Sequence, residues 1–133
     1  MLKVKNYLSV LVLLCFSGCQ NGGIPEDLKT DIADMKLMLD NGDKVGLIEN
    51  YGWDYHEYVR SIGKSDEALN NMASKVDDNL VAYLDAILIS EPYKYNDEDP
   101  ESYEFRVEGE FVADMPIYFI KYKKEETWKI LFP

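Results

Sequence analysis

The chain has 133 residues, which is enough for one domain and too few for two. Apolar residues make up 47% of the chain and aromatic residues 13%, a composition that excludes an intrinsically disordered protein. The formal net charge is −11, and without Lys3 and Lys5 near the N-terminus it is −13, from 12 basic and 25 acidic side chains. Such a charge repels phosphate backbones and anionic lipid headgroups, so it argues against nucleic-acid binding and against membrane binding through surface charge.

The first 18 residues have the features of a secretory signal. Lys3 and Lys5 precede an apolar run from residue 7 to residue 16. About ten residues are too few to cross the hydrocarbon core of a bilayer as a helix, but they suit the central region of a signal peptide. A serine and a glycine follow, and these small residues would admit a peptidase before Cys19.

The segment Phe16-Ser17-Gly18-Cys19 resembles the lipobox of bacterial lipoproteins, which reads aliphatic, small, small, cysteine. Phe16 departs from the usual leucine but is also bulky and apolar. Cys15 follows a leucine instead of a small residue, so it fits the pattern less well. The resemblance implies that residues 1–18 are a signal peptide and that Cys19 becomes the mature N-terminus, carrying fatty acyl chains such as palmitate. The alternatives are an ordinary cleaved signal with a chance cysteine, or an uncleaved anchor.

Residues 19–23 would then be the lipidated cysteine and a short polar tether. Several acyl chains give stable anchoring, whereas a single chain binds a bilayer only marginally. The tether places no acidic residue next to Cys19. In bacterial lipoproteins an aspartate there often implies retention in the inner membrane, so its absence favours an outer-membrane location facing the periplasm. Since both cysteines lie at or before residue 19, the rest of the chain has no disulfide pair and no thiolate metal site.

Residues 24–133 are predicted to form a single domain that begins with helices. Apolar residues recur at spacings of four, four, three and four from Ile24 to Leu39, which is the pattern of one helix face. Pro25 suits the start of this helix, and the following Asn-Gly pair suits its end. Asp43 is expected to cap a second helix over residues 44–51.

Two further helices are predicted before residue 89. Asp54 and Glu57 have the spacing of a capping box for a third helix that ends at Gly63. Ser65 is expected to cap a long helix whose apolar face runs as far as Leu88. The apolar face of the third helix would hold Tyr55, Tyr58, Val59 and Ile62.

The last third of the chain is predicted to form antiparallel strands. Residues 93–100 are polar and acidic, which indicates a loop or a ragged edge strand. The pattern then predicts a strand over 103–108 with a bulge at Gly109 and a continuation through Phe111, a turn at 114–116, a strand over 117–122, a hairpin turn at 123–126 and a last strand over 128–132. We therefore expect an α+β fold in which N-terminal helices pack on a curved antiparallel sheet of about three to five strands.

Two short segments and the order of elements resemble the nuclear-transport-factor-two-like domains. Residues 39–43, Leu-Asp-Asn-Gly-Asp, are similar to the turn after that family's first helix, and residues 127–131, Thr-Trp-Lys-Ile-Leu, are similar to its last strand. This group includes polyketide-cyclase-like and ketosteroid-isomerase-like proteins. The resemblance covers residues 24–133 and implies a cone-shaped fold with a pocket. It implies no activity, because the family's catalytic residues cannot be matched one by one.

The densest polar and aromatic cluster of the chain is Trp53, Asp54, Tyr55, His56 and Glu57. These residues are candidates for a pocket mouth, in which Asp54 or Glu57 would act as a general base and a tyrosine as a donor. In the alternative interpretation both carboxylates cap the helix and the aromatic rings pack in the core. His56 is the only histidine, so the chain cannot supply a cluster of zinc-binding histidines.

The remaining motifs assign no catalytic, cofactor-binding or metal-binding residue. The acidic loop 96–101 offers oxygen ligands for calcium, but it lacks the glycine and the distant glutamate of an EF-hand, so a solvated loop is favoured. The chain has no nucleophile elbow, phosphate loop, dinucleotide fingerprint or Cys-x-x-Cys motif.

We therefore predict a lipoprotein attached to the bilayer through Cys19, with a non-enzymatic domain that binds a small apolar ligand or an envelope protein. One alternative is a small isomerase-like or cyclase-like enzyme, which requires a buried carboxylate base beside a tyrosine. Another alternative is an acidic, inhibitor-like module for a basic partner, which follows from the charge of the chain.

Overall fold

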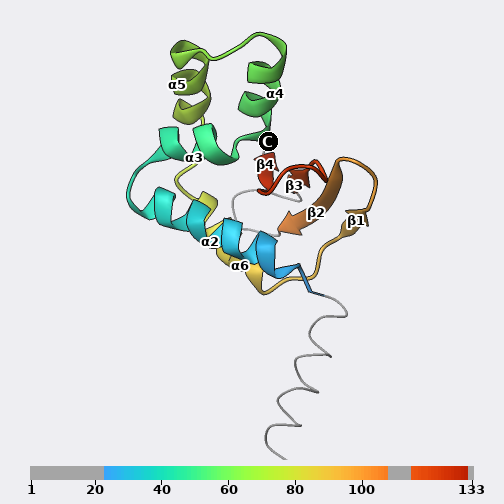
Figure 1. Ribbon diagram of the computed structural model, residues 1–133. Coiled ribbons are helices and arrows are strands. Elements are labelled where there is room, and N and C mark those ends of the chain that lie inside the picture. The colour runs from blue at the N-terminus through green and yellow to red at the C-terminus, as the bar shows by residue number, and fades with distance from the viewer. Residues whose placement is uncertain (1–22, 108–114, 132–133) are drawn as a thin grey trace, which may run out of the picture.

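The structure is a computed structural model that describes residues 23–107 and 115–131. Within these ranges five helices come first and four strands follow (Figure 1). The helices are α2 (Glu26–Asp40), α3 (Lys44–Tyr51), α4 (Trp53–Ser61), α5 (Asp66–Ser74) and α6 (Leu80–Leu88). The strands are β1 (Lys94–Asn96), β2 (Glu101–Val107), β3 (Met115–Lys121) and β4 (Lys129–Leu131).

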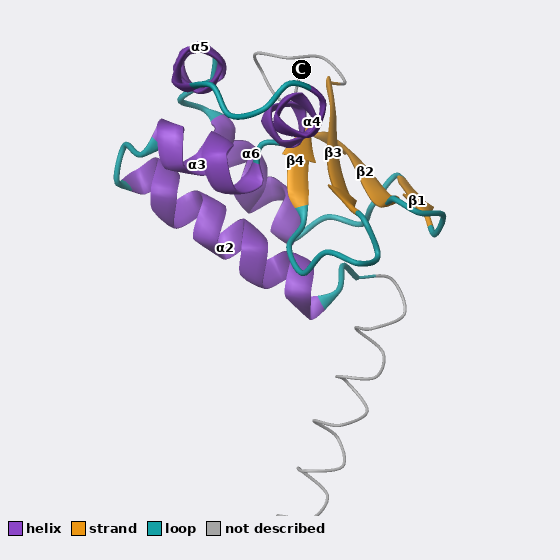
Figure 2. Cartoon of the chain, turned by 45° about the horizontal axis from the view of Figure 1, so that its top comes forward, coloured by secondary structure: helices purple, strands orange, loops and turns teal. Residues whose placement is uncertain are grey.

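The strands form one open antiparallel sheet in the order β1-β2-β3-β4. Figure 2 shows α4 next to β4 and β1 at the opposite edge of the sheet. The helix α2 packs on α3 and α6, and α6 also contacts β2. Helices packed on an antiparallel sheet of this size confirm the predicted α+β fold.

The ends of α2 and α3 lie where the sequence predicts them. Gly42 has a φ of +73°, a conformation that glycine adopts without strain, and it turns the chain after α2. The side chain of Asp43 accepts a hydrogen bond of 2.8 Å from the Gly46 backbone N–H and so caps α3. The predicted apolar face of α2 is buried through Leu28, Ile32 and Met35.

The start of α4 differs from the prediction. The helix begins at Trp53, and Gly52 occupies the cap position without a side-chain hydrogen bond. Asp54 therefore lies in the first turn, and it forms no capping box with Glu57. The predicted burial of Ile62 is also wrong, since this side chain is 73% exposed just beyond the end of the helix.

The long helix predicted from Ser65 to Leu88 is interrupted, and α5 and α6 are separate helices. Asp77 and Asn79 are poor helix formers, and the Asp77 carboxylate accepts a hydrogen bond of 2.8 Å from the Asn79 backbone N–H. The Lys44 ammonium donates to the Val76 carbonyl oxygen at 3.0 Å, which occupies an acceptor outside any helix. The predicted apolar face is nevertheless in the core at Leu69, Val76, Leu80, Leu84 and Ile87.

The strands confirm most of the predicted sheet. The polar segment 93–100, for which the sequence predicts a loop or an edge strand, contains the edge strand β1. A turn connects β3 to β4, as predicted. The predicted turn at 114–116 is wrong for Met115 and Pro116, which belong to β3. Pro116 lies opposite Arg106 and beyond the residues that pair with β4, so its missing N–H leaves no gap in that ladder. Gly109, Phe111, Asp114 and Phe132 lie outside the described residues.

The core fills the space between the helices and the sheet. Its largest buried side chains are Trp128, Phe105 and Phe119. Phe105 and Phe119 meet edge to face, with 5.8 Å between their ring centroids. This packing fixes β2, β3 and the start of β4 against the helices, and it leaves the junction of α3 and α4 at the β4 edge.

Candidate functional site

A single glycine joins α3 to α4 and holds both helices close to the sheet. Gly52 ends α3, starts α4 and forms an isolated parallel bridge with Ile130. A Cβ atom at this position would lie 2.8 Å from the Ile48 carbonyl oxygen, closer than a side chain can approach. Glycine is therefore required by the close contact, and it places the first turn of α4 beside β4.

A cavity of about 260 Å³ lies at this junction. The half-buried side chains of Trp53, Met72 and Leu131 give it apolar surface, whereas Asp54 and Lys75 are exposed. The residues that line it come from α3, α4, the end of α5 and β4; they are Ile48, Gly52, Trp53, Asp54, Tyr55, Met72, Lys75, Ile130 and Leu131.

Trp53 is half-buried and lines this cavity, and a residue that follows β3 fixes the position of its ring. Its indole stacks on the ring of Tyr122, with 5.4 Å between the centroids and 28° between the planes. The Arg60 guanidinium lies 4.5 Å from the centre of the same tyrosine ring. Glu57 pairs with Arg60 at 3.1 Å, so the stack is held by both α4 and the end of β3.

A second and more polar hollow of about 430 Å³ lies beside α4. It shares Tyr55 with the first cavity. His56 lines it, and the His56 Nε2 atom is 2.8 Å from the Glu49 carbonyl oxygen. Burial lowers the pKa of His56, and the nearby charge of Lys129 lowers it further. The lining residues are Glu49, Asn50, Tyr55, His56, Val59, Lys64, Asp66 and Leu69.

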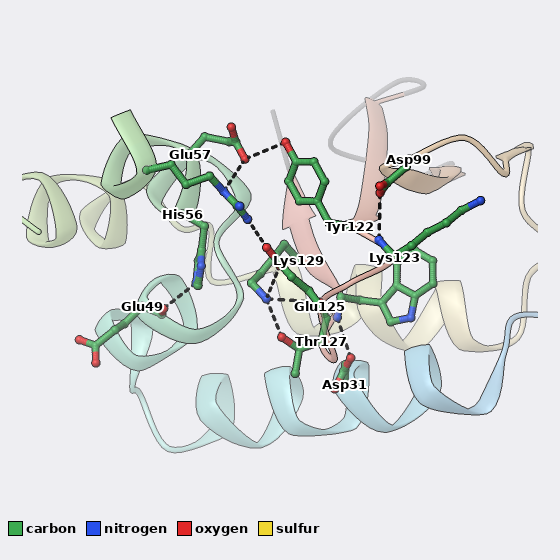
Figure 3. Close-up of polar contacts among 12 residues, drawn as sticks. Asp31, Glu49, His56, Glu57, Asp99, Tyr122, Lys123, Glu125, Thr127 and Lys129 are labelled. Atoms are coloured by element: carbon green, nitrogen blue, oxygen red, sulfur yellow. Dashed lines mark hydrogen bonds and ion pairs between the residues drawn. The ribbon is translucent and has the colours of Figure 1, made fainter. Parts of the chain in front are cut away.

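Figure 3 shows the polar contacts that connect α4 to the turn between β3 and β4. Glu125 forms an ion pair with Arg60 and lies 3.8 Å from the Lys129 ammonium. Lys129 is only 4% exposed, and its ammonium donates to the Thr127 carbonyl oxygen and to Thr127 Oγ1. Burial lowers the pKa of Lys129. This buried lysine lies in a strand whose alternation indicated an outward position, and only the packing of α4 on β4 explains its burial.

A buried carboxylate lies beside the start of β4. Asp31 is 8% exposed, and its Oδ2 atom accepts a hydrogen bond of 2.9 Å from the Trp128 backbone N–H. Burial raises the pKa of Asp31, while the Trp128 N–H and the charge of Lys129 act in the opposite direction. Next to it, the Tyr51 hydroxyl donates to Asp34 at 2.5 Å. Asp31 lines neither of the two hollows, and its hydrogen bond fixes the start of β4.

The five candidate residues from the sequence do not form one site. Trp53, Asp54 and Tyr55 line the first cavity, and Tyr55 and His56 line the second. Glu57 lines neither hollow, because its carboxylate faces Arg60 and the Tyr122 hydroxyl. The sequence pattern does not single out the cavity residues contributed by other elements, namely Ile48, Met72, Lys75, Ile130 and Leu131. The apolar spacing of Met72 and Ile130 indicates burial, but it does not show which side chains meet.

The acidic loop between β1 and β2 uses two of its side chains to hold backbone. Asn96 accepts a hydrogen bond from the Glu98 N–H at 3.0 Å, and Asp99 accepts one from the Lys123 N–H at 2.9 Å. Across residues 23–107 and 115–131, histidine, cysteine and carboxylate side chains form no group of three or more that could hold a metal ion.

Comparison with known protein families, with curated protein sequences and with solved structures gives no match for this chain. The resemblances to bacterial lipoproteins and to nuclear-transport-factor-two-like domains therefore stay predictions. Residues 1–22, which contain the segment that resembles a lipobox, lie outside the described ranges. Among the described helices, none is both long enough and apolar enough to cross a bilayer.

Proposed function

We propose that the chain is a lipid-anchored protein of the cell envelope whose domain binds a small apolar ligand in the cavity beside Gly52. The observation that carries the proposal is the lining of this cavity. The half-buried side chains of Trp53, Met72 and Leu131 offer apolar surface to it, and covering such surface contributes roughly 25 cal/mol per Å². Apolar walls with a few polar groups at the opening are typical of small-molecule sites.

The anchor is proposed at Cys19, on the outer membrane and facing the periplasm. It is supported by the signal-like first 18 residues and the lipobox pattern. The domain begins directly after the short tether, where Ile24 is buried and Asp27 pairs with Lys121 of β3 at 3.3 Å. Residues 19–23 would therefore hold the domain within roughly 20 Å of the bilayer, given about 3.5 Å per extended residue.

An enzyme of the isomerase or cyclase type has less support. Asp31 is the buried carboxylate near a tyrosine that such an enzyme requires, but its oxygen is engaged by the Trp128 N–H and it lines neither hollow. The cavity itself contains Asp54, which is exposed, whereas such an enzyme requires a buried carboxylate. The geometry therefore favours binding over acid–base chemistry.

Native mass spectrometry on full-length protein, extracted gently from a bacterial membrane, tests both parts of the proposal. We expect an acyl mass on Cys19 and a small molecule that stays with the folded domain. Cys19→Ser should abolish the acyl mass, and the matched Cys15→Ser control should retain it. An intact leader without acyl groups would contradict the anchor, and an acylated but consistently empty domain would contradict the ligand.

A second candidate is a module that binds a basic protein segment. β1 pairs only with β2 among the described strands, and Tyr93 and Tyr95 are 60% and 47% exposed at this edge. An open edge can accept an added strand, and the acidic loop 96–101 beside it would favour a basic one. Salt titration separates the cases, since such binding would weaken steeply with salt and ligand binding to the apolar cavity would not.

A further inference from the structure

The size of the cavity beside Gly52 limits the ligand to a compact molecule. A dry apolar cavity of roughly 150 Å³ accommodates one benzene ring. About 260 Å³ therefore holds a single ring or a branched side chain together with a short polar substituent. A long acyl chain or a fused multi-ring ligand would extend beyond it into solvent, because the cavity is partly open.

The aromatic wall favours a flat or bulky apolar group. Trp53 is fixed against Tyr122 by stacking, so its indole offers the cavity a surface of defined orientation. Met72 and Leu131, which are half-buried, add aliphatic surface to the lining. A ring seated there would gain both buried area and an aromatic contact of the offset or edge-to-face kind.

Two opposite charges lie at the opening of the same cavity. Asp54 comes from the first turn of α4, and Lys75 comes from the end of α5. Both are exposed, and neither forms an ion pair with another residue of the described ranges. The site therefore presents one anionic and one cationic group, from α4 and from the end of α5, beside the apolar surface of Trp53, Met72 and Leu131.

From the volume, the aromatic wall and this charge pair we propose that the cavity binds a zwitterionic amino acid with an aromatic or bulky apolar side chain. The side chain enters the cavity along Trp53, the ligand's ammonium faces Asp54, and its carboxylate faces Lys75. This inference rests on the proposed binding function and refines its ligand, which keeps an apolar group in the cavity and adds two charged groups at the opening.

A set of three probes separates the roles of ring, ammonium and carboxylate. L-phenylalanine carries all three groups, phenethylamine lacks the carboxylate, and 3-phenylpropionate lacks the ammonium. The full-length protein in detergent is titrated with each probe by calorimetry. Tryptophan emission gives a second readout, because Trp53 and the buried Trp128 are the only two tryptophans. We expect phenylalanine to bind most tightly, and each truncated probe to bind roughly two- to fivefold more weakly, as one exposed ion pair contributes.

Two variants assign each charge to one end of the ligand. Asp54→Asn should weaken phenylalanine and phenethylamine roughly two- to fivefold and leave 3-phenylpropionate unchanged. Lys75→Met should weaken phenylalanine and 3-phenylpropionate by a similar factor and leave phenethylamine unchanged. Lys64→Met and Asp66→Asn, which lie in the second hollow, are matched controls and should change none of the three affinities.

The outcomes separate this inference from the function on which it rests. Equal affinities for the three probes would overturn the proposal of a zwitterionic ligand. So would variants in which Asp54→Asn does not act on the ammonium probes alone, or Lys75→Met on the carboxylate probes alone. Failure of every probe, while native mass spectrometry still finds a small molecule on the domain, would overturn the amino-acid class and leave the binding function standing. Failure of every probe together with an empty domain would contradict both.

Discussion

At the scale of single residues, the buried Asp31 supports the start of β4 through one hydrogen bond. Asp31→Ala removes the acceptor of the buried Trp128 N–H, and we expect the free energy of unfolding at pH 7 to fall by about 1–3 kcal/mol. Asp31→Asn keeps an acceptor oxygen without the charge, so we expect its stability to stay within about 1 kcal/mol of the parent. Urea denaturation of both variants measures the difference, and equal stability of Asp31→Ala and the parent would contradict this role.

Comparison of the parent protein with Asp31→Asn also tests the pKa of Asp31. Burial raises this pKa above its ordinary value, so the folded state binds the proton more readily than the unfolded state. The contribution of Asp31 to stability should therefore increase as the pH falls through the raised pKa, and it should be lost as the pH rises. Asp31→Asn lacks this component, and the difference between the two pH profiles isolates it.

His56 should make the fold less stable in weak acid. Burial and the charges of Lys129 and Arg60 lower its pKa, while the Glu49 carbonyl oxygen and Glu125 act in the opposite direction. Because the folded state disfavours the protonated ring, stability should fall as the pH drops through the ordinary pKa of histidine, about 6.5. His56→Gln keeps a donor toward Glu49 and should show a smaller loss between pH 7.5 and 5.5 in urea denaturation. Identical losses in the two proteins would argue against His56 as the source.

Lys129 shows where residue-level prediction from the sequence ends. The alternation of β4 predicts buried Trp128 and Ile130, and the structure confirms both. The same alternation places Lys129 on the outward face, yet α4 covers that face and Lys129 is buried. Alternation indicates which residues share a face, but it contains no information on whether a second element packs there.

At the scale of elements, local signals predict helix ends well, because the groups that cap a helix are close in sequence. Asp43 and Ser65 cap α3 and α5 through backbone N–H groups three residues later, as their positions predict. The break between α5 and α6 has a local contribution from Asp77 and Asn79 and a distant one from Lys44, which is 32 residues from its acceptor at Val76. A contact of this range leaves no periodic signal, so the apolar pattern predicts one continuous helix.

The break itself can be tested through Lys44. Its ammonium donates to the Val76 carbonyl oxygen and pairs with Asp78 at 2.7 Å. Lys44→Met should lower the free energy of unfolding by about 1 kcal/mol, since the carbonyl loses its partner. It should also speed hydrogen exchange of the amides between α5 and α6. Lys124→Met, at an exposed lysine, is the control, and unchanged exchange in Lys44→Met would contradict the role of this contact.

The candidate site has the same division between local and distant signals. The cluster from Trp53 to Glu57 marks the correct helix, and three of its five members line the cavity beside Gly52. Lys75, which supplies the positive charge at the opening, comes from the end of a different helix. Composition and spacing single out the aromatic residues Trp53 and Tyr55. That Asp54 and Lys75 lie at the same opening follows only from the tertiary arrangement.

At the scale of the whole molecule, the 115 residues after residue 18 carry a net charge of −13. Ion pairs relieve part of this repulsion at points such as Asp27–Lys121 and Lys36–Asp85. Exposed acidic side chains at Asp40, Asp97 and Glu98 remain, and like charges at this density disfavour the compact state. A fold that confines so many carboxylates should respond strongly to ionic strength.

We therefore expect the melting temperature to rise by several degrees between about 10 mM and 300 mM NaCl, since the screening length falls from roughly 30 Å to less than 8 Å. Differential scanning calorimetry measures the shift. A variant with Asp40, Asp97, Glu98 and Glu126 changed to amides removes four exposed charges that form no ion pair with described residues. It should melt higher at low salt and gain less from added NaCl. If NaCl raised the melting temperature of the parent and of the variant equally, salt would not be acting through repulsion among these carboxylates. The net charge would then be better interpreted as a property of a binding surface than as a cause of lower stability.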